Sequence, residues 1–173
     1  MKLKSLSSAT ILTCTILLMM TACTKAAQET ETQEIAKEAV ASDEVQNRTA
    51  TFTADGKTYT GKVSTQHFEA TGQFSVLCHD KTDPNDSRLI QFVFKNEASA
   101  RAAGVRKIAY NAGNDQTPEE VSVTYDNTYS SDQGRAGSLS VTSSGKDNEL
   151  VFDQVALQTM SKDAVTVSGK IPF

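Results

Sequence analysis

The chain has 173 residues, and its 17 basic and 21 acidic side chains give it a formal net charge of −4. This acidic balance excludes nucleic acids and anionic lipid headgroups as partners recognised by charge, because both require clustered Lys and Arg. The length allows one domain with a sizeable hydrophobic core. Neither a Gly-rich phosphate-binding loop nor a Gly-x-Ser-x-Gly nucleophile motif is present, so no cofactor is expected.

Residues 1–22 have the three-part pattern of a secretory signal peptide. A basic start with Lys2 and Lys4 precedes an apolar run of about a dozen residues, which is too short to cross a hydrocarbon core. The alternative, a buried N-terminal helix, is disfavoured because a globular helix rarely runs so far without a charge. After removal of these two lysines with the signal, the net charge of the remaining chain is near −6.

The signal ends in Met20, Thr21, Ala22 and Cys23, which resembles the lipobox of bacterial lipoproteins, with Met20 where Leu is commonest. In that family a diacylglycerol is added to the cysteine thiol, a peptidase cuts just before the cysteine, and the new amino group is usually acylated. The resemblance implies that Cys23 is the lipidation site and that acyl chains hold the protein at a membrane, at about 0.8 kcal/mol per buried CH₂. In many Gram-negative bacteria, Asp after the cysteine favours retention in the inner membrane. Thr24 follows here, so we expect a location in the cell envelope at the outer membrane.

Cysteine usage leaves no intramolecular disulfide in the exported chain. Cys14 lies in the signal peptide, Cys23 is expected to carry lipid, and only Cys78 remains. Cys78 shares the Phe74/Val76 side of an expected strand, so we expect a buried and inert thiol.

Two segments of contrasting composition follow the signal. Residues 23–48 are rich in Ala, Glu, Gln and Thr, contain no aromatic residue, and carry six acidic against three basic side chains. Such a segment cannot bury enough apolar surface to offset the entropy of ordering, so we expect a flexible acidic tether. From residue 49 the sequence changes to β-prone runs, and residues 49–173 are expected to form one β-sandwich domain.

The β-domain is expected to consist of short strands joined by turns. Asp55 and Gly56 separate two β-prone runs and predict a hairpin. Apolar residues lie at the even positions Leu150 and Phe152 and then at the odd positions Val155 and Leu157. This change in the alternation predicts a β-bulge near residues 153–154. The further expected strands are residues 73–79, 89–94, 105–110, 121–125, 138–142 and 165–173.

One break in the β pattern predicts a short helix, with Asn96 as N-cap and Gly104 at the C′ position. The whole pattern predicts an all-β fold, either an antiparallel β-sandwich or a small barrel of about eight strands, with this one short helix. The hairpin at residues 54–59 and the closing strand at residues 167–171 resemble those of small β-rich secreted lipoproteins of uncharacterised function. This resemblance supports the fold class and implies no activity.

A thiol enzyme is the first catalytic possibility, and it needs a Cys and a His on one face. Cys78 and His79 are neighbours in a strand and should point to opposite faces, so only His67 could serve Cys78. Nothing in the sequence brings these two residues together, and no catalytic residue is expected.

A metal site is the second possibility, with His79, Asp80, Asp83 and Asp86 as weak candidate ligands. The three acids lack the alternation, the central Gly and the terminal Glu of an EF-hand loop. Residues 83–86 are adequately explained as a turn, because Pro and Asn favour turns. We therefore expect no metal.

These features predict a non-enzymatic, lipid-anchored envelope protein whose β-domain binds an unknown protein or small ligand. Tyr110, Tyr125 and Tyr129 are candidates for a recognition patch at a loop end, or are ordinary sheet residues. The first alternative is an inhibitor of a wall-degrading enzyme, which would need a protruding loop at residues 113–120 or 126–135. The second is a metal-dependent or thiol hydrolase.

Overall fold

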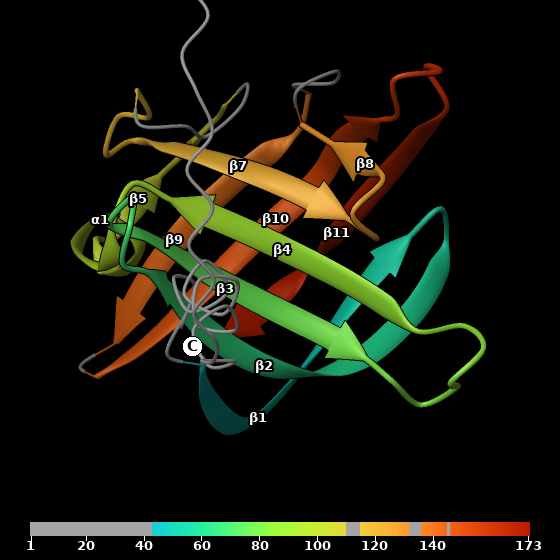
Figure 1. Ribbon diagram of the computed structural model, residues 1–173, viewed down its shortest axis with the longest axis horizontal. Helices are drawn as coiled ribbons and strands as arrows, with labels where there is room; N and C mark the ends of the chain where they lie inside the picture. The colour runs from blue at the N-terminus through green and yellow to red at the C-terminus, as the bar shows by residue number, and fades with distance from the viewer. Residues whose placement is uncertain (1–42, 110–114, 132–135, 145) are drawn as a thin grey trace, which may run out of the picture. The chain divides into compact units, whose positions relative to one another are not determined.

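The computed structural model describes residues 43–109, 115–131, 136–144 and 146–173, with side chains described from Asn47 onward. In these residues the backbone forms a closed, antiparallel eight-stranded β-barrel with one short helix (Figure 1). The barrel strands are β1 (Asp43–Ala54), β2 (Lys57–Phe68), β3 (Gln73–Asp80), β4 (Arg88–Phe94), β7 (Glu120–Tyr125), β8 (Tyr129–Ser130), β10 (Asp147–Gln158) and β11 (Ala164–Pro172). The predicted all-β fold is confirmed, and of the two expected architectures the barrel is present rather than the sandwich.

Four further elements lie outside the ring of eight strands: α1 (Glu97–Arg101), β5 (Gly104–Val105), β6 (Lys107–Ile108) and β9 (Ser138–Ser144). β9 pairs with the first half of β10, β5 pairs with β9, and β6 pairs in parallel with β7. α1 and β5 lie at the left end of the barrel in Figure 1, which we call the helix end. The opposite end, which carries the turns at residues 55–56, 126–127 and 159–163, we call the turn end.

No helix within the described ranges has the length and apolar character needed to span a membrane.

The barrel closes by pairing of its first and last strands. β1 and β11 are hydrogen-bonded from Thr51 opposite Lys170 to Ala54 opposite Val167. Beyond Lys170 the two strands separate. Phe173 and Asn148 exchange both backbone hydrogen bonds across β11 and β10, so the intervening Pro172 faces the gap. Because proline has no N–H, Pro172 presents no backbone donor to the gap from the β11 side.

Two predicted local features are confirmed. Asp55 and Gly56 both have positive φ, 49° and 76°, as a two-residue type I′ hairpin turn requires. In β10 the register shifts between Phe152 and Val155, and Gln154 has a φ of 51°, which is the expected bulge. The bulge turns both Phe152 and Val155 inward, so a single strand contributes to the core along its whole length.

Large apolar side chains fill the interior of the barrel. Six phenylalanines, Phe52, Phe74, Phe92, Phe94, Phe152 and Phe173, are each at most 2% exposed. Burial of one such ring contributes about 1.5–3 kcal/mol to stability. The interior is therefore a packed core, in keeping with the size of an eight-stranded barrel.

The boundary between tether and domain differs from the expected one. β1 begins at Asp43, six residues before the expected start at residue 49, because residues 43–45 pair with residues 64–66 of β2. Backbone pairing orders this piece although its composition is polar. The signal peptide, Cys23 and the rest of the tether, residues 1–42, lie outside the described residues.

The helix begins as predicted and ends earlier. The Asn96 side chain accepts a hydrogen bond from Ser99 N and the Ser99 side chain accepts one from Asn96 N, which is a capping box. The helix ends at Arg101 with Ala102 as C-cap, and Gly104 lies in β5 instead of at C′. Arg106 explains the early end, because its buried guanidinium donates to the carbonyl oxygens of Ser99, at 2.8 Å, and of Ala102.

The strand expected at residues 105–110 is also shorter than predicted. Only Lys107 and Ile108 form β6, and Arg106 turns inward between β5 and β6. Tyr110 lies outside the described residues.

Candidate functional site

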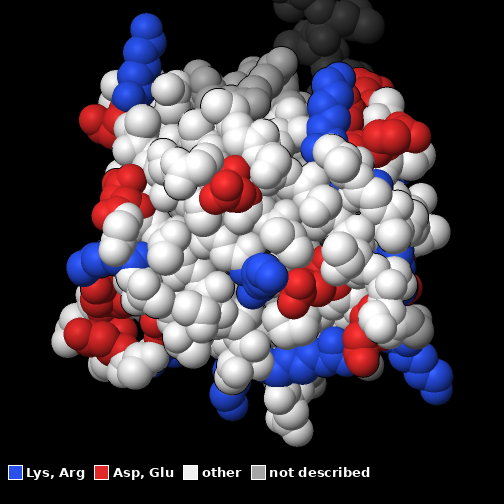
Figure 2. Space-filling model, turned by 180° about the vertical axis from the view of Figure 1, so that it is seen from behind, with Lys and Arg blue, Asp and Glu red and all other residues white. Residues whose placement is uncertain are grey.

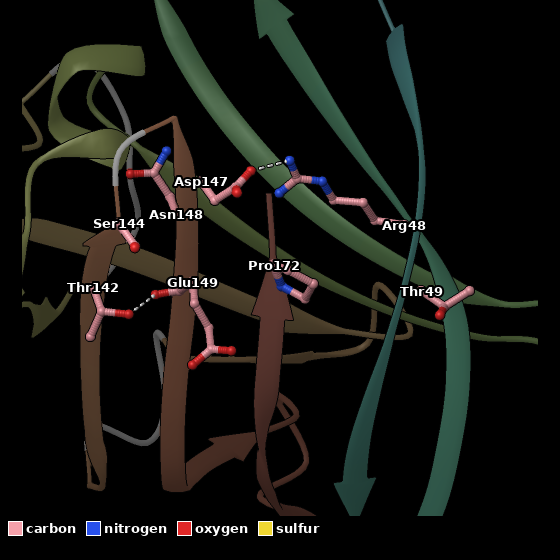
Figure 3. Close-up of a pocket in the computed structure, with 8 residues that line it drawn as sticks. All are labelled: Arg48, Thr49, Thr142, Ser144, Asp147, Asn148, Glu149 and Pro172. Atoms are coloured by element: carbon pink, nitrogen blue, oxygen red, sulfur yellow. Dashed lines mark hydrogen bonds and ion pairs between the residues drawn. The ribbon is translucent and has the colours of Figure 1, made fainter.

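One hollow lies where β1 and β11 separate, and we call it the seam slot. It has a volume of about 640 Å³, and Figure 3 shows the residues that line it. Arg48 reaches from β1 across the gap, and its Nη2 lies 2.6 Å from Asp147 Oδ1. Both side chains are partly exposed, so this ion pair contributes at most about 1 kcal/mol. The pair bridges the seam, and Glu149, which also lines the slot, lies 4.0 Å from Lys170 Nζ.

A second hollow, of about 680 Å³, lies on the outer face of β2, β3 and β4, and we call it the β2–β4 groove. Strand register brings its outward side chains together: Lys62 lies opposite His79, and His79 lies opposite Leu89. Leu77 on β3 and Leu89 on β4 are half-buried on this outer face and form an apolar floor. The groove therefore combines an apolar floor with a polar and basic border.

The charges around the β2–β4 groove are unbalanced. Lys62 and Lys81 line it, and no Asp or Glu is among its described lining residues. Asp80 follows His79 on β3 and is bonded to two residues that line the groove. Its carboxylate accepts hydrogen bonds from the Thr82 hydroxyl, from Thr82 N at 2.8 Å and from Thr60 N at 3.2 Å. These bonds, with the Thr82 hydroxyl first, hold the pKa of Asp80 below its usual value. Asp80 thus fastens the strand ends at the border of the groove.

His79 links the groove to a third hollow, of about 500 Å³, at the turn end. Its Nε2 lies 2.8 Å from Ser87 Oγ. Partial burial, followed by the nearby charge of Lys81, lowers the pKa of His79 from its ordinary value of 6.5. The imidazole is therefore neutral at pH 7 and adds hydrogen-bonding capacity without charge.

A network centred on Arg88 closes the turn end. Arg88 pairs with Asp86 and, through Nη1 at 2.8 Å, with Asp126 Oδ2. A hydrogen bond between Tyr59 and Arg88 raises the pKa of the guanidinium, and burial raises the pKa of the Tyr125 phenol. Both shifts favour the charged guanidinium and the neutral phenol at pH 7, so the network has a structural role.

The expected tyrosine patch is partly assembled. The rings of Tyr125 and Tyr129 lie 5.9 Å apart beside the third hollow, whereas Tyr110 lies outside the described residues. Tyr125 is buried and also packs against Phe52, with ring centres 6.2 Å apart. Tyr125 is thus a core residue, and Tyr129 is the more accessible of the pair.

The structure separates the residues that a thiol enzyme would need. Cys78 faces the interior with no exposed surface, and burial raises the pKa of its thiol to about 11. Cys78 pairs with Val63, whereas His67 pairs with Phe74, four positions further along the strands. At about 3.3 Å per residue the two side chains are about 13 Å apart. His67 instead contacts Glu97, with Nε2 and Oε2 at 3.3 Å.

The weak metal candidates each have another partner. Asp80 binds Thr60 and Thr82, Asp83 Oδ1 accepts from Asn85 N at 2.8 Å, and Asp86 pairs with Arg88. Asp86 N also donates to Asp83 O, which confirms the predicted turn at residues 83–86. In the part of the chain that the structure describes, no group of three His, Cys, Asp or Glu side chains could hold a metal ion.

The described parts of the two candidate loops are held close to the barrel. Gln116 is buried, and its Nε2 donates to Val93 O at 2.8 Å and to Glu120 O at 3.1 Å. Asp126 and Asn127 form a tight turn with φ values of 51° and 55° between β7 and β8. Sequence reasoning missed the anchoring by Gln116, since a lone polar residue in a loop carries no local signal.

Sequence reasoning also missed the β2–β4 groove, although a signal was present. Leu77 has the opposite phase to the core residues Val76 and Cys78, and Leu89 begins a run that is apolar in both phases. An apolar residue in the outward phase of a solvated strand marks a surface feature. On the opposite face of the molecule, Figure 2 shows charges of both signs at the margin and near the middle of the face, without a large patch of one sign.

Comparison of the chain with protein-family models, with curated proteins and with solved structures finds no match.

Proposed function

We propose that the protein is a lipid-anchored lipoprotein of the cell envelope whose barrel binds another molecule with its outer surface and catalyses no reaction. In this proposal the acylated Cys23 holds the chain at the outer membrane, and the acidic segment that follows connects the anchor to β1. The lipobox resemblance at Met20–Cys23 and the signal pattern before it support the anchor.

The filled interior is the observation that carries the proposed binding role. Barrels that store a ligand keep an internal cavity, whereas the interior here is packed with phenylalanine rings such as Phe92 and Phe152, whose centres lie 4.8 Å apart. A ligand is therefore expected to bind outside, where the β2–β4 groove, the seam slot and the third hollow at the turn end are candidate sites. The separation of Cys78 from His67 supports a role without thiol catalysis.

The anchor is tested by the intact mass of the native protein and by the variant Cys23→Ala. We expect the native mass to include diacylglycerol on Cys23, and the variant to accumulate as uncut, unacylated precursor. Cys14→Ala is the matched control, because it changes a cysteine of the signal without changing the lipobox. Correctly cut and released protein from Cys23→Ala would contradict the proposed anchor.

The binding role is tested by photo-crosslinking in intact cells, with a photoreactive amino acid in place of Ser64 in the β2–β4 groove, of Ser144 in the seam slot or of Thr128 in the third hollow. We expect a discrete crosslinked product from at least one position. A metal analysis of the purified protein, and hydrolase assays of the Cys78→Ser and His79→Ala variants, test the enzyme alternatives. A hydrolytic activity lost in either variant while the fold is kept would contradict the non-enzymatic role.

A further inference from the structure

The β2–β4 groove has a charge opposite in sign to that of the whole chain. The chain has a net charge of −4, yet the charged side chains that line the groove in the described residues are Lys62 and Lys81. Neither lysine forms an ion pair with a carboxylate of the described residues. Uncompensated positive charge in a concave surface attracts anionic groups.

The lining of the groove is suited to a peptide rather than to a lipid chain. Leu77 and Leu89 provide the apolar floor, and the other side chains exposed in the groove are polar or charged. The walls include the Ser64 hydroxyl and the Gln66 amide, which can bond to peptide groups. A fatty-acyl chain would leave these polar groups without partners, which is unfavourable.

The strands under the groove have no free edge. β2 pairs with β1 and β3, β3 pairs with β2 and β4, and β4 pairs with β3 and β7. A bound segment therefore cannot add to these three strands as a further strand, which is a common mode of peptide binding. Recognition must come from side chains, and the two lysines are the charged ones.

We propose that the β2–β4 groove binds an acidic peptide segment of a partner protein. Lys62 and Lys81 pair with its carboxylates, and Leu77 and Leu89 contact an apolar side chain between them. This inference rests on the proposed binding function and assigns its site and the chemistry of its partner. Because both lysines are exposed, salt screens their attraction to the peptide. Binding should therefore weaken as added salt shortens the Debye length below about 10 Å.

The test uses the full chain in detergent and a fluorescein-labelled peptide in which Glu alternates with Leu, followed by fluorescence anisotropy at about 50 mM salt. We expect saturable binding, and no binding of the same peptide with Gln in place of Glu. The double variant Lys62→Glu/Lys81→Glu should bind about tenfold more weakly, from two lost ion pairs and two new repulsions. Leu77→Ser should also weaken binding, with the far-UV circular dichroism unchanged.

The matched control is Lys146→Glu/Lys162→Glu, which changes the net charge by the same amount at two exposed lysines outside the groove. Equal weakening in both double variants would mean non-specific attraction and would overturn the proposal. A full chain with Glu29, Glu31, Glu34 and Glu38 changed to Gln supplies a second check. Peptide binding seen only in that variant would mean that the chain's own acidic segment competes for the groove, and the proposal of a partner segment would be wrong.

Failure of this inference is distinguishable from failure of the proposed function. The photoreactive group at Ser64 is placed in the wild type and in Lys62→Glu/Lys81→Glu. An identical crosslinked product of equal yield from both would refute the acidic-peptide site and leave the binding function intact. Absence of any product at Ser64, at Ser144 and at Thr128 would refute the binding function itself.

Discussion

Burial determines the reactivity of the Cys78 thiol. Its thiol faces the core, and its Sγ lies 3.8 Å from Ala50 O. Burial disfavours the thiolate and raises the thiol pKa to about 11. A thiol that remains protonated and inaccessible cannot act as a nucleophile.

We predict that Cys78 reacts slowly with iodoacetamide in the native protein and rapidly in urea, as measured by peptide mass spectrometry. The unfolded thiol has a pKa of 9.0, so between pH 9.0 and about 11 the unfolded state loses a proton that the folded state retains. The free energy of unfolding should therefore fall as pH rises through this window. Cys78→Ala should remove that part of the fall, and an alkylation rate equal in both states would contradict the burial.

Gly169 is required where two phenylalanines meet. A Cβ at this position would lie 2.9 Å from Phe152 Cζ and 2.9 Å from both Cα and Cβ of Phe52. The absence of a side chain on β11 thus lets two rings from β1 and β10 share one layer of the core.

We predict that Gly169→Ala lowers the free energy of unfolding by about 1–3 kcal/mol, because overpacking forces the rings or the backbone to shift. Urea unfolding followed by circular dichroism measures the change. Lys170→Ala, an exposed position on the same strand, should change stability by less than about 0.5 kcal/mol. Equal effects of the two substitutions would show that the close contact at Gly169 is relieved without strain.

At the scale of elements, α1 covers the helix end of the barrel. Arg101 lies over the rings of Phe74 and Phe173, with its guanidinium 5.8 Å and 6.0 Å from the ring centres, and forms an ion pair with Glu97 at 2.7 Å. Because α1 has only five residues, it depends on its caps and its packing rather than on helix propensity. The capping box at one end and Arg106 at the other supply partners for the free backbone groups.

We predict that Asn96→Ala destabilises the protein by about 1 kcal/mol, because Ser99 N then loses its acceptor. Amide hydrogen exchange should speed up in α1 before it does in β3 and β4. Asn96→Asp is the control, since its carboxylate can accept the same hydrogen bond and should keep most of the stability. Loss of equal size in both variants would contradict the capping role.

At the scale of the whole molecule, closure makes the barrel dependent on contacts between distant parts of the chain. Thr51 and Lys170 pair across the closure, and the two strands are at opposite ends of the described chain. This long-range pairing of β1 with β11 forms only when the chain between the two strands is also ordered. We therefore expect one cooperative unfolding transition.

We predict that the whole domain loses stability in acid in two stages. Burial and the charge of Lys81 lower the pKa of His79. Hydrogen bonds from the Thr82 hydroxyl and from Thr82 N lower the pKa of Asp80. A hydrogen bond from Thr117 N and one from Lys107 lower the pKa of Glu120. Each group binds protons more readily when unfolded, so the free energy of unfolding falls as pH drops, first below 6.5 and again below about 4.5. Solvent screening keeps the individual contributions small.

The measurement for this prediction is the urea midpoint between about pH 8 and pH 3. His79→Gln should abolish the fall that begins near pH 6.5 and keep the fall at lower pH, because the two acidic groups are unchanged. A midpoint that rises as the pH drops below 6.5 would show that His79 gains a favourable partner when protonated.

Sequence alone determined the features that a few neighbouring residues control. The Asp55-Gly56 turn, the Asn96 cap and the bulge at Gln154 were all predicted, since each depends on local φ preferences or on a change of periodicity. The all-β class follows from the same alternation. The inert Cys78 was predicted for the same reason, because strand phase alone assigns a residue to one face.

Only the tertiary structure decided between sandwich and barrel, because alternation shows that one face of a strand is buried and not which strand is its neighbour. It also decided that residues 43–45 are ordered, since their order comes from pairing with β2. The β2–β4 groove depends on the same cause: Leu77 and Leu89 are far apart in sequence and become neighbours through the pairing of β3 with β4. Strand register is set by contacts between distant segments, which no local window of sequence contains.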